Sequence, residues 1–238
     1  MRVLEVPERV AVVTGGAGAI GASITTALRD TGHRAVLLDR DADADANVAC
    51  DLSSEVSARA AAATVLERHG RCDVLVHCAA AFDRATIAEV DAATWRRVQA
   101  VNVESALWLV QAFAPGMAER RFGRIVFIAS DTVWAPPNPA MLAYIASKGA
   151  LLGIMRTLAV TLGADGIAVS AVAPGLTDTP GARTRNGDEH FDAVVRGQAL
   201  KRPLTPGDTA AAVAYLASDA AAAMTGQVLC ADGGLVMR

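Results

Sequence analysis

A tyrosine and a lysine lie at a spacing that could carry proton-transfer chemistry. Tyr144 and Lys148 are four residues apart in the stretch YIASK, so on a helix their side chains share one face, one turn apart. A free phenol titrates near pH 10, which makes it a poor proton donor at neutral pH, and a nearby positive charge lowers its pKa. Because the Lys148 ammonium supplies such a charge, the phenol can give a proton to a carbonyl oxygen or take one from an alcohol.

A serine provides the second polar group of this candidate site. Ser130 ends the apolar run RIVFIAS, at residues 124–130, which we predict to be a strand. From that position its hydroxyl can donate a hydrogen bond to the same oxygen as negative charge develops there. The next residue, Asp131, could contact a polar or cationic group of a substrate, or could be a turn residue that hydrogen-bonds to its own backbone.

A glycine-rich turn near the start of the chain favours dinucleotide binding. The apolar run VAVVTG, at residues 10–15, continues as GAGAIG into a predicted helix from about Ile20 to Thr31. Glycines permit the tight turn and let backbone N–H groups at the helix N-terminus approach a pyrophosphate. The predicted cofactor contacts in this turn are Gly15, Gly18, Ala19, Ile20 and Gly21.

Residues at the ends of the next two predicted strands favour NAD over NADP. Asp39 ends the run RAVLLD, where its carboxylate can accept hydrogen bonds from ribose hydroxyls and would repel a 2′-phosphate. The neighbouring Arg40 could instead grip a 2′-phosphate, or could be a solvated loop charge. Asp51 ends the run VACD, where it could accept a hydrogen bond from the adenine amino group or cap the following helix. Leu52 beside it is also predicted to contact the cofactor.

These residues must be positioned by short apolar runs that alternate with amphipathic segments. Strands are predicted at 10–15, 34–39, 48–51, 73–80, 124–130, 168–174 and over QVLCADGG, with helices at about 20–31, 55–69, 95–120, 143–162 and 206–218. Apolar strands without polar alternation imply a sheet that is covered on both faces. We therefore predict an α/β fold: a single-domain, Rossmann-type, doubly wound parallel sheet with helices on both faces, spanning residues 1–238.

Two polar segments interrupt this alternation. An acidic, Ala-rich loop is expected from Asp41 to Asn47. The segment at about 180–202 is polar, Arg-rich and only weakly periodic, and we predict it to be a mobile substrate lid. Within it, Arg183, Arg185 and His190 could recognise a carboxylate or phosphate, or could form a solvated charged face.

The motifs, taken in order, resemble the short-chain dehydrogenase/reductase family along nearly the whole chain. The family's TGxxxGxG appears as Thr14 to Gly21 with Ala19 in place of the middle glycine, and its NNAG appears as HCAA at 77–80. Asn102 matches the family's helix asparagine, PGLTDT at 174–179 matches its PG-x-x-x-T segment, and 228–234 resembles its closing strand. The resemblance implies an NAD(P)-dependent oxidoreductase.

The resemblance also implies roles for individual residues. The catalytic residues would be Asn102, Ser130, Tyr144 and Lys148, with Asn102 keeping its helix locally open and holding a water that links Lys148 to solvent. Further cofactor contacts would come from Ala79, Ala80, Tyr144, Lys148, Pro174, Gly175, Thr177 and Thr179. The substrate wall is expected to be mostly apolar and to consist of Asp131, Trp134, Pro136, Pro137, Met141 and Leu142. The expected reaction is hydride transfer between NAD(H), with NADP less favoured, and a small-molecule secondary alcohol, ketone or aldehyde.

Composition excludes several other classes. The net charge of -3 gives no electrostatic footprint for nucleic acid or an anionic membrane. No stretch is expected to reach the length of a bilayer, and the N-terminus has no signal-peptide pattern, so a cytoplasmic protein is predicted. The four cysteines, Cys50, Cys72, Cys78 and Cys230, are expected to be buried free thiols. His77 and Cys78 invite a metal assignment, but strand neighbours point to opposite faces, so no metal is predicted.

Two alternatives and an assembly state remain to be tested. Arg40 would favour an NADPH-dependent ketoreductase of the 3-oxoacyl type, which Asp39 disfavours. A nucleotide-binding regulator without activity would keep the fold, but the intact catalytic set argues against it. The resemblance, together with the apolar segments from Trp95 to Arg120 and Ala143 to Leu162, predicts a homotetramer.

Overall fold

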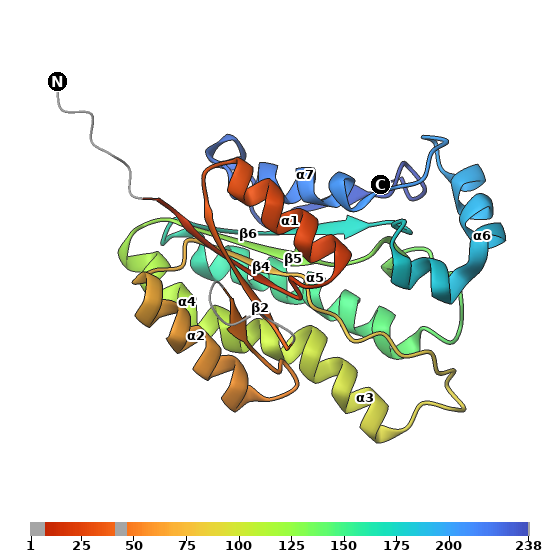
Figure 1. The fold of residues 1–238 in the computed structure, drawn as a ribbon, viewed down its shortest axis with the longest axis horizontal. Coiled ribbons are helices and arrows are strands. Elements are labelled where there is room, and N and C mark those ends of the chain that lie inside the picture. Colours follow the sequence, from red (N-terminus) through yellow and green to blue (C-terminus); the bar gives the residue numbers. More distant parts are fainter. Residues whose placement is uncertain (1–7, 41–46, 238) are drawn as a thin grey trace.

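A seven-stranded parallel sheet forms the centre of the molecule (Figure 1). The computed structural model describes residues 8–40 and 47–237, so residues 41–46 of the expected acidic loop lie outside the described residues. The strands are β1 (Val10–Thr14), β2 (Arg34–Asp39), β3 (Val48–Ala49), β4 (Val74–His77), β5 (Gly123–Ile128), β6 (Ile167–Pro174) and β7 (Val228–Ala231). They lie in the order β3-β2-β1-β4-β5-β6-β7, and every pairing is parallel. This confirms the predicted fold class.

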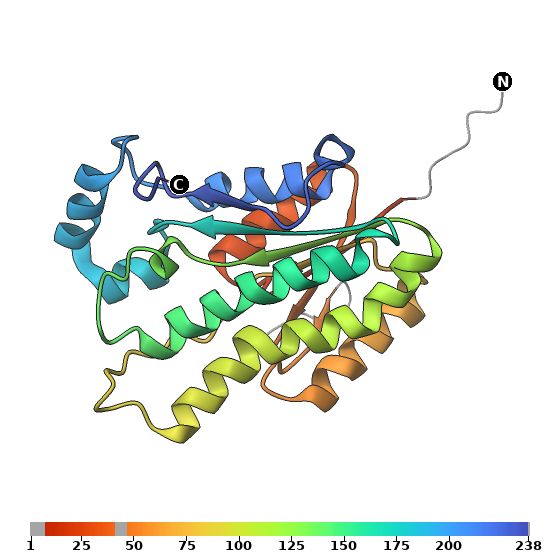
Figure 2. The same ribbon diagram turned by 180° about the vertical axis from the view of Figure 1, so that it is seen from behind.

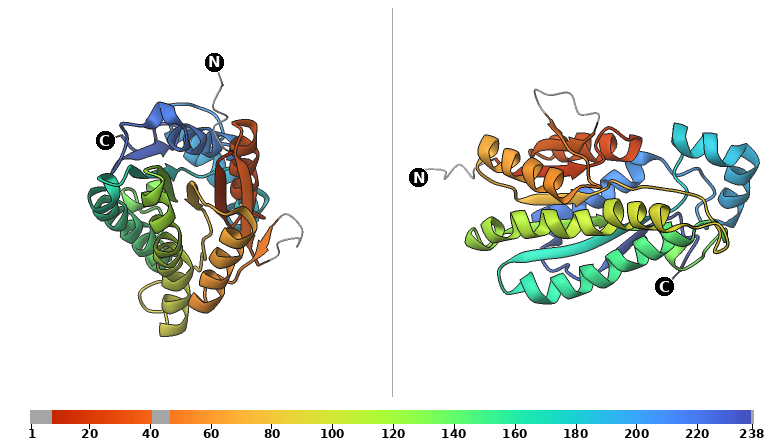
Figure 3. Two further views of the ribbon diagram at one scale, coloured as in Figure 1. Left: turned by 90° about the vertical axis from the view of Figure 1, so that its left-hand side faces the viewer. Right: turned by 90° about the horizontal axis from the view of Figure 1, so that it is seen from below.

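Helices cover both faces of the sheet because each strand is apolar on both sides. Along β1, Val10 and Val12 belong to the larger core with helices α2 (Glu55–His69), α4 (Ser105–Glu119) and α5 (Leu142–Gly163). Ala11 and Val13 point the other way, into a core with α1 (Ala19–Asp30) and α7 (Pro206–Ala217). The three layers are visible from behind and from the side and below (Figures 2 and 3).

The predicted helix from Trp95 to Arg120 is wrong as a single regular element. The chain instead forms α3 (Ala92–Gln99), one π-helical segment (Ala100–Glu104) and then α4. The π segment lies where polar side chains interrupt the apolar pattern, and Asn102 within it is fully buried. The sequence pattern predicted the apolar faces of α3 and α4. The π-helical turn between them could not be predicted in this way, because it depends on hydrogen bonds to residues distant in sequence.

The predicted lid is a helix rather than an irregular segment. Helix α6 (Pro180–Gly197) begins at the Thr179 cap, whose side chain accepts a hydrogen bond from the backbone of Ala182, and it kinks at Gly187, whose φ is 72°. Phe191 buries itself beneath this helix while most neighbouring side chains stay exposed. Its weak periodicity therefore reflects a helix that covers one end of the molecule with a narrow apolar face (Figure 1).

A buried carboxylate ties together the edge of the sheet opposite the strand carboxyl ends. Asp73 has no exposed surface, and its side chain accepts hydrogen bonds from Arg71 (2.7 Å), Arg120 (3.1 Å) and the backbone N–H of Val10 (2.9 Å). These contacts join the starts of β1 and β4 to the end of α4. Burial opposes ionisation, but the hydrogen bonds from Arg71 and Val10 outweigh it, so the pKa of Asp73 is lowered.

Two expectations are corrected: that no stretch reaches the length of a bilayer, and that all four cysteines are buried. Helix α5 is long and apolar enough to cross a membrane, with a mean hydropathy of 1.4 in its most apolar window, although it packs on β5 and β6 and buries Lys148. Of the cysteines, Cys50 and Cys72 are buried, but Cys78 is half-buried and Cys230 is exposed. Cys230 lies on β7, which is an edge strand of the sheet formed by the described residues.

Candidate active site

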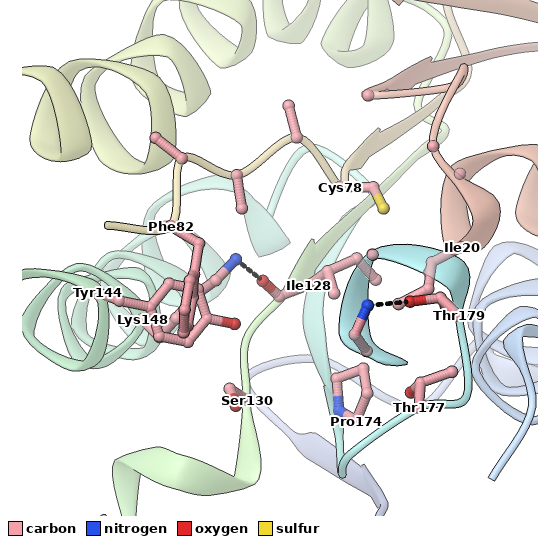
Figure 4. Close-up of a pocket in the computed structure, with 18 of the residues that line it drawn as sticks. Ile20, Cys78, Phe82, Ile128, Ser130, Tyr144, Lys148, Pro174, Thr177 and Thr179 are labelled. Carbon is pink, nitrogen blue, oxygen red and sulfur yellow. Dashed lines mark hydrogen bonds between the residues drawn. The ribbon is translucent and has the colours of Figure 1, made fainter. Parts of the chain in front are cut away.

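A cavity of about 840 Å³ opens at the carboxyl ends of the strands. It lies beside the point where the strand order reverses, between β1 and β4, which is the usual ligand site of a doubly wound sheet. All predicted cofactor contacts line it: Gly15, Gly18, Ala19, Ile20, Gly21, Asp39, Arg40, Asp51, Leu52, Ala79, Ala80, Tyr144, Lys148, Pro174, Gly175, Thr177 and Thr179. Figure 4 shows several of these side chains converging on the cavity.

Two glycines of the turn, Gly15 and Gly21, have no room for a side chain. Gly15 has a φ of 67°, and a Cβ there would lie 2.7 Å from the Cα of Ala79; a Cβ on Gly21 would lie 2.2 Å from the carbonyl oxygen of Gly15. Gly18 caps α1 without any side-chain hydrogen bond, so N–H groups of the first turn face the cavity unshielded. Such a cradle fits the pyrophosphate of a dinucleotide.

Carboxylates end β2 and follow β3 at the far side of this cradle. Asp39 accepts a hydrogen bond from the backbone N–H of Ala17 (3.0 Å), which ties it to the glycine turn. Asp51 accepts from the N–H (2.9 Å) and hydroxyl (2.7 Å) of Ser53, and these bonds lower its pKa. The N-cap of α2 is Ser54, so the alternative assignment of Asp51 as the helix cap is wrong.

Tyr144, Lys148 and Ser130 line the same cavity as the glycine turn. The Lys148 Nζ donates to the carbonyl of Ile128 (2.6 Å) and lies 5.5 Å from the centre of the Tyr144 ring. Figure 4 shows the three side chains on one side of the cavity. Burial lowers the pKa of Lys148 to about 8.

The acidity of the Tyr144 phenol is governed mainly by its burial. Burial raises the pKa of Tyr144 to about 12, although the neighbouring Ser130 hydroxyl and the charge of Arg185 act in the opposite direction. The physical reason is that removing water from around the phenol penalises its anion more than the neighbouring groups stabilise it. The expectation that Lys148 and an oxidised nicotinamide lower this pKa stays a prediction.

Asn102 lies behind these groups and does not line the cavity. Its side chain accepts from the N–H of Ala81 (2.7 Å) and donates to the carbonyl of Ala81 (3.0 Å) and to the hydroxyl of Ser147 (2.9 Å). Ser147 in turn donates to the carbonyl of Tyr144 (2.6 Å). Asn102 thus joins the loop after β4 to the helix that bears Tyr144.

His77 and Cys78 do not share one environment. The Nε2 of His77 hydrogen-bonds to Ser105 (2.8 Å), and burial lowers the pKa of this histidine to about 3. Cys78 borders the cavity, and its backbone N–H, like that of Ala79, donates to the Thr14 hydroxyl (3.0 Å). Within residues 8–40 and 47–237, no three acidic, Cys or His side chains are grouped to hold a metal.

Comparisons with known proteins agree with this geometry. A family model described as enoyl-(acyl carrier protein) reductase matches residues 15–236. Galactitol 2-dehydrogenase (L-tagatose-forming) of Cereibacter sphaeroides is 35% identical over 237 residues, covering 94% of this chain and 93% of that protein. The chain belongs to the short-chain dehydrogenase/reductase family. It is therefore similar to oxidoreductases that act on alcohols, and its family uses NAD(P).

Two further comparisons extend the likeness of this short-chain dehydrogenase/reductase. The cis-4-hydroxycyclohexanecarboxylate dehydrogenase of Sinomonas cyclohexanicum is 34% identical over 251 residues, covering 95% of this chain and 96% of that protein. The solved structure of gox2181 has a TM-score of 0.88 at 31% identity, covering 96% of this chain and 95% of that one. The matches extend over nearly the full length of each protein.

The substrate end of the short-chain dehydrogenase/reductase cavity differs in part from expectation. Asp131, Pro137 and Met141 line it, but Trp134, Pro136 and Leu142 do not. Pro136 and Leu142 border a separate hollow of about 320 Å³, and Trp134 packs against the larger core. The loop between Ser130 and Tyr144 therefore turns some of its apolar side chains away from the site.

Asp131 is a buried turn residue. It lies 6% exposed in a 3₁₀ turn, accepts a hydrogen bond from the Ser130 hydroxyl (3.3 Å), and has its pKa raised to about 6, mainly by burial. The turn is folded inward, against the cavity, and both expected roles of Asp131, contact with a substrate group and a hydrogen bond to its own backbone, stay predictions.

Several lining residues were missed by the sequence analysis. Phe82 and Arg84 follow β4, and the ring of Phe82 packs edge-to-face on Tyr144 with centroids 4.8 Å apart. Asn186 of α6 reaches across to accept a hydrogen bond from Arg84 (2.7 Å). Phe82 follows the HCAA motif at residues 77–80, and no local sequence pattern indicates that its ring packs on Tyr144.

Proposed function

We propose that this protein is an NAD(H)-dependent oxidoreductase that interconverts a small secondary alcohol and its ketone, or an aldehyde. The observation that carries the proposal is the convergence of Tyr144, Ser130 and Lys148 on the cavity that also contains the glycine cradle. A dinucleotide held there would accept or supply a hydride. The chain itself would then supply the proton, the orientation and the exclusion of water.

The proposed proton path begins at the phenol. Tyr144 would take a proton from the substrate hydroxyl during oxidation, or return it to the carbonyl oxygen during reduction. Ser130, which lines the same cavity as Tyr144, would donate to the same oxygen as its negative charge grows. Lys148 would hold the nicotinamide ribose and favour the phenolate, while Asn102 would keep the supporting helix in place.

Charge at the end of β2 supports NAD as the cofactor. The Asp39 carboxylate lines the cavity and would repel a 2′-phosphate at the ribose. Arg40 lines the same cavity, and this favours the NADPH-dependent 3-oxoacyl-type ketoreductase as the second candidate. Titration with both cofactors separates the two candidates.

Small hydroxylated molecules are the proposed substrates. The relatives described above are named for galactitol and for cis-4-hydroxycyclohexanecarboxylate, both of which carry hydroxyl groups on a small carbon skeleton. Residues 180–202, mostly helix α6, would form the substrate lid of one continuous domain over residues 1–238, because this helix contributes Arg185, Asn186 and His190 to the cavity wall.

A panel of polyols, cyclic alcohols and aryl alcohols tests the proposal. Absorbance of the reduced nicotinamide at 340 nm gives the rate with NAD and NADP for each substrate. We expect turnover of at least one secondary alcohol, with the higher kcat/KM for NAD. Failure of every alcohol and ketone with both cofactors would contradict an enzymatic function, and binding of NAD alone would then favour a regulator.

A further inference from the structure

Resting on the proposed function, we infer that Arg185 forms a subsite for an anionic group, so that the preferred alcohol or ketone carries a carboxylate or a similar anion. Arg185 projects from α6 into the wall of the cavity at its substrate end. Its guanidinium carbon lies 5.3 Å from the centre of the Phe82 ring, and Phe82 packs on Tyr144. Two ring contacts therefore separate this cation from the reacting phenol.

Arg185 is exposed at the cavity wall and forms no salt bridge within the described part of the chain. Arg183, two residues earlier, is held by Asp178 (2.7 Å) and Asp188 (2.6 Å) and stacks on Phe191. Arg97, which also lines the cavity, pairs with Asp83. No carboxylate in residues 8–40 or 47–237 forms an ion pair with Arg185, so its five donors remain available to a ligand.

A second cation lies next to this subsite. Arg84 lines the cavity and donates to the neutral side-chain oxygen of Asn186, the residue after Arg185. This bond joins the loop after β4 to α6, and no carboxylate among the described residues forms a salt bridge with Arg84. Two guanidinium groups on facing segments create a positive potential at the mouth of the substrate end, which favours an anionic ligand.

The acidic residue at this end defines the orientation of the ligand. Asp131 contacts Ser130, whereas Arg185 contacts Phe82, and these two neighbours lie on different parts of Tyr144. An anion beside Asp131 would be repelled, so it is directed toward Arg185 while the hydroxyl meets Ser130 and Tyr144. The field of Arg185 reaches the site, since its charge lowers the pKa of Tyr144.

The test compares two matched substrates that differ in charge. Wild-type protein, with NAD or with whichever cofactor it uses, is assayed with 4-(1-hydroxyethyl)benzoate and the neutral 4-(1-hydroxyethyl)benzamide. We expect kcat/KM to favour the carboxylate by about tenfold or more, the order of one charge-assisted hydrogen-bonded contact. In R185Q this ratio should fall by about tenfold, mostly through KM, and R185K should retain part of it as a point charge.

Controls distinguish this subsite from general charge and from the proposed function. R196Q removes an exposed arginine from the same helix outside the cavity and should leave the ratio unchanged. Equal efficiency for both substrates, or an unchanged ratio in R185Q, overturns the anionic subsite while the oxidoreductase function stands. If neither alcohol reacts, calorimetric titration of cofactor-loaded protein with benzoate still decides: loss of binding in R185Q supports the subsite, and absence of binding to wild type refutes it.

Discussion

At the residue scale, burial of Tyr144 and Lys148 favours their neutral forms, whereas the proposed reaction needs their charged forms. Burial raises the pKa of Tyr144 to about 12 and lowers that of Lys148 to about 8, so both side chains are pushed toward their neutral forms. Proton abstraction from an alcohol needs the phenolate. The positive charge of an oxidised nicotinamide would act in the required direction, which links the acidity of the phenol to cofactor binding.

Tyr144→Phe should separate binding from turnover. The variant keeps the ring that packs on Phe82 and removes only the exchangeable proton, so NAD affinity should change little while kcat falls by at least about 100-fold. Lys148→Ala should impair both, and Ser130→Ala should mainly lower kcat. Fluorescence titration of NAD and steady-state kinetics measure the two effects; substantial turnover by Tyr144→Phe would contradict the mechanism and direct attention to Asp131.

The pH profile of alcohol oxidation tests the same pair. Oxidation needs the deprotonated acceptor, so the rate should rise with pH, through an apparent pKa below the roughly 10 of free tyrosine. That value belongs to the coupled Tyr144–Lys148 pair rather than to either residue. Profiles of kcat between pH 6 and pH 10.5 give the value. A rate that still rises tenfold per pH unit at pH 10.5, as the cofactor-free pKa of about 12 would give, would show that cofactor charge does not tune the phenol.

Asp39→Ala should narrow the preference for NAD over NADP by about tenfold, because it removes one like-charge repulsion at the ribose. The substitution also removes the acceptor for the Ala17 N–H, so Asp39→Asn, which can keep that bond without the charge, is the matched control. The ratio of kcat/KM for the two cofactors is the measurement. Higher efficiency with NADP in the wild type would contradict the assignment outright.

At the element scale, Asp73 should contribute more to stability than any exposed ion pair. Asp73→Asn removes the charge that balances Arg71 and Arg120 and should cost about 2–4 kcal/mol of unfolding free energy at pH 7. Because the folded pKa lies below the unfolded one, the stabilisation is present above pH about 4 and is lost as pH falls through the folded pKa.

Urea unfolding at pH 7 and at acidic pH measures this difference. The control is Asp165→Asn, which removes an exposed pair with Arg121 at 3.8 Å and should cost less than about 1 kcal/mol. A gap between wild type and Asp73→Asn that stays constant down to pH 3 would contradict the ionic origin of the stabilisation.

Helices and strands could be predicted where they follow from a local sequence pattern. Features that depend on contacts between distant residues could not. The strands, the glycine turn and the YxxxK helix follow from runs of residues adjacent in sequence, and the structure forms them within a few residues of the predicted bounds. The π segment, the inward turn of Asp131 and the packing of Phe82 on Tyr144 depend on partners distant in sequence. Periodicity carries no information about such partners.

At the scale of the whole molecule, we expect a homotetramer. Helix α5 is strongly apolar, yet only 33% of its most apolar window is buried in the single chain, and Val160 on it is 85% exposed. Light scattering at micromolar concentration should report four chains. Val160→Asp should lower the mass if α5 lies in an interface, whereas Val56→Asp, on the equally exposed surface of α2, should not. A monomeric wild type would refute the expectation.

The π segment fixes the helical phase of everything on either side of it. A π turn contains one residue more than an α turn, so α4 is rotated relative to the direction that α3 alone would give it. If residues 100–104 wound as a regular α-helix at the same length, one flank would turn by about 100° against the other. The hydrogen bond between Asn102 and Ala81 and the one between Ser105 and His77 could then not both form. A substitution that lets this stretch wind as a regular α-helix should therefore disturb the site more than a substitution at its exposed surface.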